Sequence, residues 1–238
     1  MMDRPSLEIA GFREPDSLQP PYLFAPYGGT VRRAPLQRPI EVPATLSEVT
    51  GPAGDWERLM GSAADDLTVT GKGEPLGERI VVAGRVVDEN GRAVGNTMIE
   101  IWQANAAGRY LHENDQHRAP LDPNFTGAGR AITDALGRYR FTTIKPGAYP
   151  WSNHANAWRP AHVHLSVFGP GFATRLVTQM YFPGDPLLDI DPIAGAVPKA
   201  ARERLVARLD LSTTVAGFAL GYRFDIVLRG RLATPMES

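Results

Sequence analysis

Two histidines separated by one residue carry the clearest indication of chemistry in this sequence. His162 and His164 lie in Arg159–Phe168, where they alternate with the apolar Ala161, Val163, Leu165 and Val167. Side chains of a β-strand alternate between its faces, so a strand here would place both imidazoles on one face. Imidazole binds zinc, copper, iron and nickel. These residues alone leave two interpretations open, a metal site or two histidines on a solvated face.

The pattern does not set the remaining ligands. There is no cysteine, so a thiolate site is excluded. A site of two histidines and one carboxylate would need a well-placed acidic residue. The candidates are Glu100, Glu113, Asp115, Asp122, Asp134, Asp185 and Asp189. Most of them lie in turn-like segments, where solvation or local capping accounts for them. His112, His117 and His154 lie in loop-like segments and are expected to stay outside the site.

Two tyrosines stand in more constrained contexts. Tyr110 follows a strand-like segment and a turn of small residues, and Tyr149 lies between Pro146 and Pro150. Each is equally explained as packing at a loop edge. A phenolate is a hard anionic donor that favours a trivalent ion such as Fe(III), which can ionise the phenol. Two phenolates and two neutral imidazoles would leave one net positive charge, which a hydroxide or an anionic substrate could balance.

Composition and charge exclude several functional classes. The chain has 238 residues, 43% hydrophobic and 21% charged, which is ordinary for a globular protein. The net charge of −1 gives no basic stripe for nucleic acid. Met1–Ser6 lacks the apolar core of a signal peptide, and no apolar run is long enough to span a membrane. We expect a soluble, cytoplasmic protein with neither a nucleic-acid nor a membrane partner.

The elements that must position these residues divide the chain into two parts. Residues 1–78 are rich in proline and glycine, predict no helix, and suit an extended irregular arm that contacts a partner subunit. Residues 79–238 are expected to form the catalytic domain. Its first strand is Arg79–Val87, a hairpin turn follows at Asp88–Gly91, and Thr97–Trp102 is expected to return beside the first strand.

Further short strands are predicted at Arg138–Thr142, Ala161–Phe168, Thr174–Phe182 and Tyr222–Leu228. Their lengths and spacings favour an all-β fold, an antiparallel β-sandwich. One short helix towards the C-terminal end is expected, opened by Pro198 and running over Lys199–Leu209.

Several motifs, taken together, resemble a known family. They are Gly84–Asp88, Ile101–Asn105, Gly108–Tyr110, Leu121–Phe125, Thr143–Gly147, Tyr149–Pro150 and Arg159–His164. Over residues 27–231, their order and spacing are similar to those of the intradiol ring-cleaving dioxygenases, in particular the catalytic β subunits of the enzymes that cleave protocatechuate. Those folds are sandwiches of the transthyretin type.

The resemblance implies one Fe(III) per chain, held by Tyr110, Tyr149, His162 and His164, with Tyr149 as the ligand that substrate displaces. It implies that a catecholic acid and O2 are the substrates and that both oxygen atoms enter the product. For protocatechuate that product is 3-carboxy-cis,cis-muconate, in aromatic catabolism by the β-ketoadipate pathway. The metal would act as a Lewis acid and template.

Other roles follow from the same resemblance. Arg159 and Gln179 would act in catalysis and contact the substrate, while Tyr27, Trp151 and Ile193 would line the substrate pocket. A homologous α subunit would complete the site in a higher hetero-oligomer and supply groups for the substrate carboxylate. Trp102 is expected to pack beside the ligands. The plainer interpretations remain a surface salt bridge for Arg159, a polar strand edge for Gln179, and core packing for Trp151 and Ile193.

Three alternatives stay open at this point. Catechol and hydroxyquinol differ from protocatechuate by a ring substituent, so the enzyme could be either intradiol dioxygenase. Gly84–Val94 and Thr133–Tyr139 would also suit a non-catalytic, transthyretin-like or carboxypeptidase-regulatory-like interaction module. A zinc or Fe(II) hydrolase or oxygenase could use the two histidines with a carboxylate.

Overall fold

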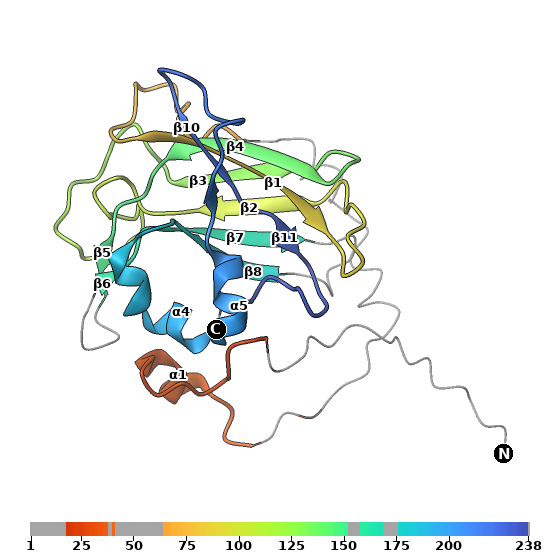
Figure 1. The fold of residues 1–238 in the computed structure, drawn as a ribbon. Coiled ribbons are helices and arrows are strands. Elements are labelled where there is room, and N and C mark those ends of the chain that lie inside the picture. Colours follow the sequence, from red (N-terminus) through yellow and green to blue (C-terminus); the bar gives the residue numbers. More distant parts are fainter. Residues whose placement is uncertain (1–17, 38–39, 41–63, 152–157, 169–175, 238) are drawn as a thin grey trace, which may run out of the picture.

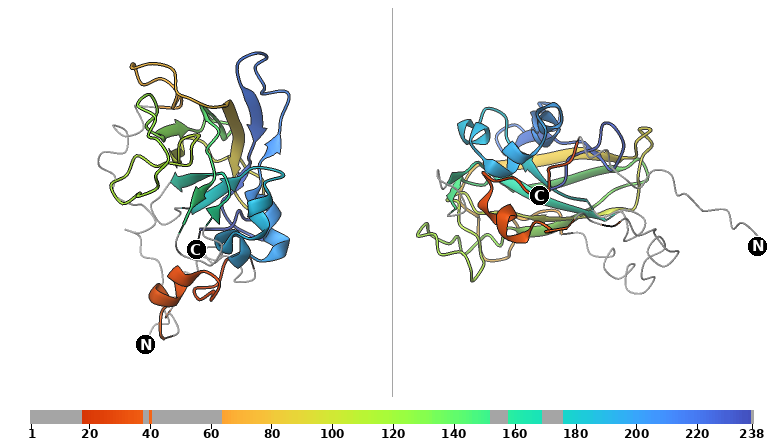
Figure 2. Two further views of the ribbon diagram at one scale, coloured as in Figure 1. Left: turned by 90° about the vertical axis from the view of Figure 1, so that its left-hand side faces the viewer. Right: turned by 90° about the horizontal axis from the view of Figure 1, so that it is seen from below.

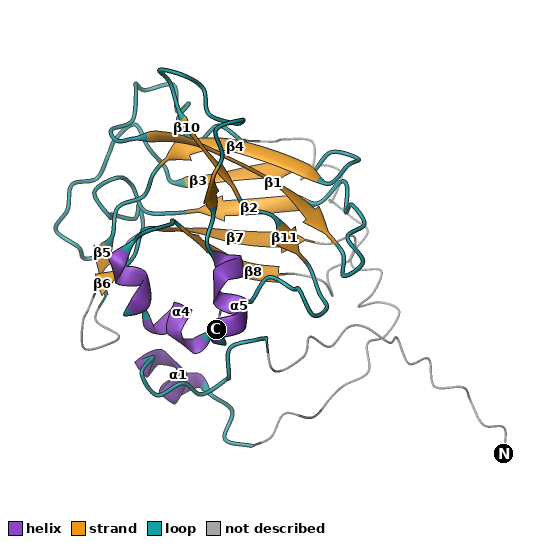
Figure 3. Cartoon of the chain, viewed as in Figure 1, coloured by secondary structure: helices purple, strands orange, loops and turns teal. Residues whose placement is uncertain are grey.

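The computed structural model describes residues 18–37, 40, 64–151, 158–168 and 176–237, and there the protein is mostly β (Figures 1 and 3). The strands are β1 (Arg79–Val87), β2 (Met98–Trp102), β3 (Ala128–Ile132), β4 (Arg138–Ile144), β5 (Tyr149–Pro150), β6 (Trp158–Arg159), β7 (His162–Phe168), β8 (Leu176–Tyr181), β9 (Arg208–Leu209), β10 (Leu220–Arg223) and β11 (Ile226–Val227). The helices are α1 (Gly28–Arg33), η2 (Pro186–Asp189), α4 (Pro192–Ala196), α5 (Lys199–Arg202) and η3 (Glu203–Leu205).

The first sheet is built around β1, which has the predicted bounds. β1 pairs with β4 in antiparallel register and with β10 and β11 in parallel register. The expectation of a wholly antiparallel arrangement is therefore wrong for this sheet. The predicted hairpin partner is also wrong. The turn forms, with Val87 bridging Ala93, but Met98–Trp102 then crosses to the other sheet because β4 and β10 already occupy both edges of β1.

The second sheet carries the histidines. Its strand order is β3-β2-β7-β8, and every neighbouring pair is antiparallel. Val163, Leu165 and Val167 of β7 are fully buried, as the alternation predicts, in an apolar cluster that also contains Ile80 and Val82 of β1. Burying such side chains contributes roughly 1.5–3 kcal/mol each. Because one apolar core joins both sheets, β7 has little freedom to move.

The helices depart from expectation at both ends of the chain. Pro198 caps α5 as predicted, but the helix ends early and turns into η3 at Glu203. Residues from Val206 onward pair with strands instead, since the Ala207 amide donates to the Tyr181 carbonyl at 2.9 Å. The expectation that residues 1–78 contain no helix is wrong at α1. There the Thr30 hydroxyl donates to the carbonyls of Phe24 and Tyr27, which closes the turn despite two glycines.

Figure 1 and the left view of Figure 2 show α4, α5 and α1 towards the same, lower end of the molecule. Within residues 64–78, Ala64 bridges Arg130 of β3, and Asp66 bridges Thr142 of β4. This stretch therefore packs on the domain rather than standing apart from it. Residues 1–17, 38–39 and 41–63 of the predicted arm lie outside the described residues. No helix among the described residues is both long and apolar enough to cross a membrane.

Candidate metal centre

The two histidines of β7 point their Nε2 atoms at one another. These atoms lie 3.2 Å apart, and the rings meet at 75° with centroids separated by 4.8 Å. Two nitrogens bound to one ion at about 2.1 Å each would be separated by about 3 Å. His162 and His164 are also buried, so the interpretation of this face as solvated is wrong.

The outer nitrogens of both rings have acceptors. His162 Nδ1 lies 2.8 Å from the Pro160 carbonyl oxygen, which can only accept, so Nδ1 carries the proton. His164 Nδ1 lies 3.1 Å from the Glu237 carboxylate. Trp102 stacks on His164 with 6° between the rings, which agrees with the packing role expected of it. Both rings are thus oriented with Nε2 facing the other histidine.

Electrostatics keeps His162 in the form that binds a metal. Burial, followed by the neighbouring Arg159 guanidinium and His164, holds the pKa of His162 well below its ordinary value. A neutral imidazole is the metal-binding form. The ring is therefore ready to bind a cation at neutral pH without first losing a proton.

The two tyrosines complete the cluster. The Tyr149 hydroxyl lies 3.4 Å from His162 Nε2, and the rings of Tyr110 and Tyr149 meet edge to face at 5.3 Å. The Tyr110 hydroxyl is buried with no hydrogen-bond partner among the described residues. Such an orphaned group costs roughly 1–3 kcal/mol unless something pairs with it. A metal ion bound by these four side chains would fill that role.

Burial raises the pKa of Tyr110 well above its ordinary value, and it also raises that of Tyr149 although Arg159 opposes it. The protein alone therefore keeps both phenols protonated, and a strong Lewis acid is needed to ionise them. The donor set fits a hard trivalent ion. No group of three or more His, Cys, Asp or Glu side chains able to hold a metal occurs in the described part of the chain, so the two-histidine, one-carboxylate alternative has no candidate there.

Close backbone packing brings the two tyrosines together. Gly108 has a φ of +77°, and a Cβ built on it would lie 2.1 Å from the Ala148 carbonyl oxygen. The Asn105 side chain accepts from the Arg109 amide at 2.9 Å, and the Asn105 carbonyl accepts from the Gly147 amide at the same distance. The loop before Tyr110 is therefore tied to the segment that enters Tyr149.

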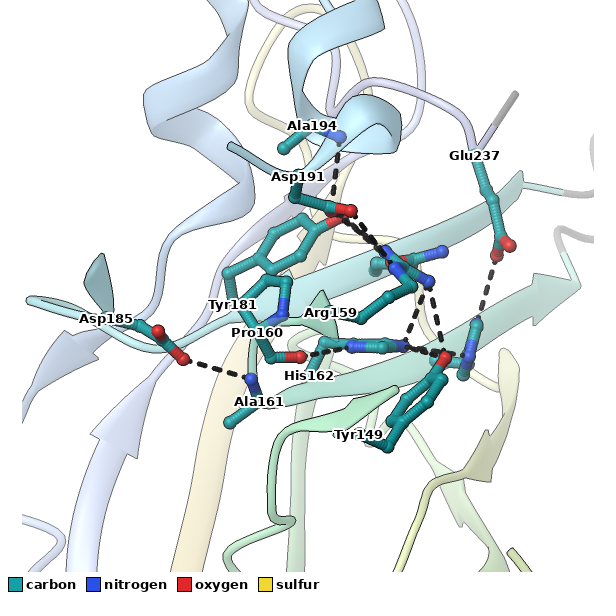
Figure 4. Close-up of polar contacts among 12 residues, drawn as sticks. Tyr149, Arg159, Pro160, Ala161, His162, Tyr181, Asp185, Asp191, Ala194 and Glu237 are labelled. Carbon is teal, nitrogen blue, oxygen red and sulfur yellow. Dashed lines mark hydrogen bonds and ion pairs between the residues drawn. The ribbon is translucent and has the colours of Figure 1, made fainter. Parts of the chain in front are cut away.

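Arg159 is buried at the centre of a polar network (Figure 4). Asp191 accepts from Nε at 3.1 Å and from Nη2 at 2.9 Å, while Nη2 also donates to Gln179 and Tyr181 at 2.6 and 3.1 Å. Asp191 in addition caps α4 by accepting from the Ala194 amide. The interpretation of Arg159 as a surface salt bridge is wrong, because both members of the pair are buried.

With Nε and Nη2 taken by these acceptors, the remaining nitrogen of Arg159 faces the candidate ligands His162 and Tyr149. Nη1 lies 3.3 Å from His162 Nε2 and 3.5 Å from the Tyr149 hydroxyl. Burial would lower the pKa of Arg159, but Tyr181 and Asp191 together outweigh it and raise the pKa above its ordinary value. The guanidinium therefore stays charged. A fixed cation is thereby aimed at the atoms around which negative charge would gather.

The expected pocket residues lie around this network. Trp151 places its ring 5.3 Å from the Arg159 guanidinium, and Tyr27 meets Trp151 edge to face, also at 5.3 Å. Ile193 is buried in α4, the helix that Asp191 caps. Gln179 is the register partner of His164 and is buried, so it is not an exposed polar edge. His112 and His117 lie in loops, and His154 falls outside the described residues.

Three residues of the site were not anticipated from the sequence: Tyr181, Asp191 and Glu237. Asp191 precedes Pro192, a pairing typical of a helix start, and that signal marks its capping role. Tyr181 shares a strand face with Gln179 at a spacing of two, which could have placed it beside the histidines. No local pattern connects Glu237 with His164, since 73 residues separate them.

Comparison with known proteins decides the family. A family model described as Dioxygenase matches residues 49–230, and one described as Protocatechuate 3,4-dioxygenase beta subunit N terminal matches residues 12–45. The chain belongs to the intradiol dioxygenases. An intradiol dioxygenase is an enzyme, so the interpretation as a non-catalytic interaction module is wrong.

Relatives of this intradiol dioxygenase include proteins named as beta chains and as alpha chains of protocatechuate 3,4-dioxygenases. It is 61% identical over 220 residues to the protocatechuate 3,4-dioxygenase beta chain of Burkholderia cepacia, covering 92% of this chain and 93% of the relative. It is 31% identical to the alpha chain from Pseudomonas putida, covering 81% and 95%. The solved 3-chlorocatechol 1,2-dioxygenase of Rhodococcus opacus 1CP is 26% identical and superposes with a TM-score of 0.53, covering 69% and 64%.

Proposed function

We propose that this chain is the catalytic β subunit of a protocatechuate 3,4-dioxygenase, which converts protocatechuate and O2 into 3-carboxy-cis,cis-muconate. One Fe(III) per chain would be held by Tyr110, Tyr149, His162 and His164. The observation that carries the proposal is the convergence of two imidazole nitrogens 3.2 Å apart with two phenols, one of which has a buried hydroxyl without a described partner. The 61% identity to a β chain of that name supports the substrate.

When bound, the ferric ion would supply Lewis acidity that ionises the phenols and the catecholic hydroxyls. The protein's own contribution begins with Tyr149. Its hydroxyl is 3.5 Å from Arg159 Nη1, so a phenolate there keeps a positive neighbour. Tyr149 Oη would take up one hydroxyl proton from the arriving catechol, and substrate would occupy the position that this side chain gives up.

Arg159 would stabilise negative charge on the bound substrate. Its guanidinium is fixed through Nε and Nη2 by Asp191, so Nη1 needs no reorientation during the reaction. Preorganised donors of this kind, aimed at developing charge, account for a large part of many rate enhancements. Gln179, held against Nη2 at 2.6 Å, would contribute a second oriented polar group on the same side.

The substrate ring would lie among Trp151, Ile193 and Tyr27. A homologous α subunit would complete this pocket and bind the substrate carboxylate, in a higher hetero-oligomer. The presence of α chains among the relatives supports such a partner. The exposed apolar side chains of Leu23, Leu36 and Ile40, near the start of the described chain, also support a partner. Residues 1–78 would act as the partner-contacting arm of a 79–238 catalytic domain with a transthyretin-like sandwich.

The test is substrate choice in the full chain, coexpressed with its α partner and loaded with iron. O2 uptake and product formation are measured with protocatechuate, catechol and hydroxyquinol. We expect one O2 consumed per protocatechuate, 3-carboxy-cis,cis-muconate as product, and the highest kcat/KM for protocatechuate. A higher kcat/KM for either other catechol would overturn the substrate assignment and favour the corresponding intradiol dioxygenase.

A further inference from the structure

The outer nitrogens of the two histidines are held by acceptors of different kinds. His162 Nδ1 meets a neutral backbone carbonyl from its own loop, that of Pro160. His164 Nδ1 meets a carboxylate, that of Glu237, from a distant part of the sequence. A carboxylate behind a ligating imidazole fixes its tautomer and makes the other nitrogen a stronger donor than a carbonyl does. The two histidines are therefore not equivalent ligands.

The segment that carries Glu237 is anchored to β8, the strand next to β7. The Thr178 hydroxyl donates to the Pro235 carbonyl at 2.7 Å, and the Glu237 amide donates to the Val177 carbonyl at 2.8 Å. A further contact comes from the first described segment, where Gln19 accepts from the Met236 amide at 2.8 Å. Hydrogen bonds on both sides thus hold residues 234–237 beside the histidines.

The contact between the Glu237 carboxylate and His164 lies mostly away from solvent. The Glu237 side chain is 22% exposed, and the His164 side chain is 10% exposed, so water screens the contact only partly. In Figure 4 the Glu237 carboxylate lies above the His162 ring, whereas Tyr149 lies below it.

We propose that Glu237 is a positioning residue for the ferric site, acting through His164 to fix its tautomer and strengthen its bond to the metal. The proposal rests on the ligand set given under the proposed function. Residues 234–237 would then support the metal site, although none of the sequence motifs that contain the proposed ligands includes them. Gln19 would assist by holding Met236, the residue before it.

The test uses the full chain loaded with Fe(III), and it measures iron release to an excess of a ferric chelator through the decay of the visible absorption. Outer partners of metal ligands are typically worth about 10–100-fold in metal affinity. We expect Glu237→Ala to speed release by about that factor. Glu237→Gln keeps an acceptor without the charge and should fall between Glu237→Ala and the unchanged protein. Gln19→Ala should act in the same direction but more weakly.

Glu203→Gln, which removes one carboxylate from the surface at η3, is the matched control and should release iron at the unchanged rate. Thermal unfolding of the metal-free variants establishes that each one folds. Release rates of Glu237→Ala and Glu237→Gln equal to that of the unchanged protein would overturn the inference. If the unchanged protein itself binds no ferric ion, the proposed function fails instead, and the two failures are thereby told apart.

Discussion

The proposed histidine ligands and the proposed tyrosine ligands are presented by regions of opposite character. Both histidines lie on β7, whose 7 residues are all buried and which is paired on both sides, by β2 and β8. Tyr110 lies in a loop, and Tyr149 belongs to the 2-residue strand β5, which within the described part of the chain pairs with the equally short β6 and no other strand. We infer that the sheet holds the two imidazoles in place, whereas Tyr149, on a short peripheral strand, is the side chain that substrate could displace.

The largest effect should come from removing the fixed part of the site. His162→Ala or His164→Ala deletes one of two converging nitrogens, and we expect iron content to fall from one per chain to near zero, with loss of activity. Tyr149→Phe should retain iron, because three ligands remain and substrate is expected to displace this one. Iron content by atomic spectroscopy checks both. Full iron retention in both histidine variants would show that the histidines are not the ligands that hold the metal, and would contradict the contrast with Tyr149.

Arg159 joins the two regions, and its replacement should be next in size. Arg159→Lys keeps the charge but loses the fork that Asp191 and Gln179 hold, so we expect kcat to fall by about 10²–10³-fold, the range typical for loss of one preorganised donor. Iron content should be unchanged. Steady-state kinetics gives kcat and KM separately. A wild-type kcat would mean that charge alone, without orientation, suffices.

Gly108→Ala tests how the tyrosine region is held. The new Cβ would meet the Ala148 carbonyl at 2.1 Å, so the loop of Tyr110 must move away from Tyr149. Gly91→Ala is the matched control, because Gly91 has a similar φ of +76° but nothing within 4 Å of its Cβ. The control should cost about 1–2 kcal/mol in the free energy of unfolding. Gly108→Ala should cost more and should also weaken iron binding, as chemical denaturation and iron release will measure. Equal costs for both variants would contradict the close-packing argument.

The smallest effect is expected on the histidine side. Trp102→Leu removes the ring stacked on His164, and aromatic pairs of this kind contribute about 0.5–1.5 kcal/mol beyond their buried area. Iron release should quicken by about 2–10-fold. Phe218→Leu, at an exposed aromatic position away from the four proposed ligands, serves as control. No change for Trp102→Leu would show that strand pairing alone orients His164.

Local sequence patterns predicted the parts of the fold that depend on alternation. β1 has the expected bounds, and β7 buries its apolar residues as its spacing requires. What failed depends on partners distant in sequence. The turn at Asp88–Gly91 was predicted correctly, but its sequence does not determine that the strand after it pairs in the other sheet. Likewise, Lys199–Leu209 has helical spacing, but pairing of Val206 with Tyr181 and of Leu209 with Tyr222 ends the helix.

The site divides in the same way. The shared face of His162 and His164 follows from strand geometry alone, whereas family resemblance was needed to single out Tyr110 and Tyr149 from ordinary loop residues. Asp191 and Glu237 escaped both approaches. Each reaches its partner, Arg159 or His164, from a separate part of the chain, and only the folded arrangement brings them within hydrogen-bonding distance.

The most direct test of the four-ligand site is the visible absorption of the iron-loaded protein. Phenolate bound to Fe(III) gives an intense charge-transfer band, so the full chain should be reddish. We expect Tyr110→Phe to lose most of this colour at equal iron content. A colourless protein with one iron per chain, or an unchanged band in Tyr110→Phe, would contradict the assignment of Tyr110 as a metal ligand.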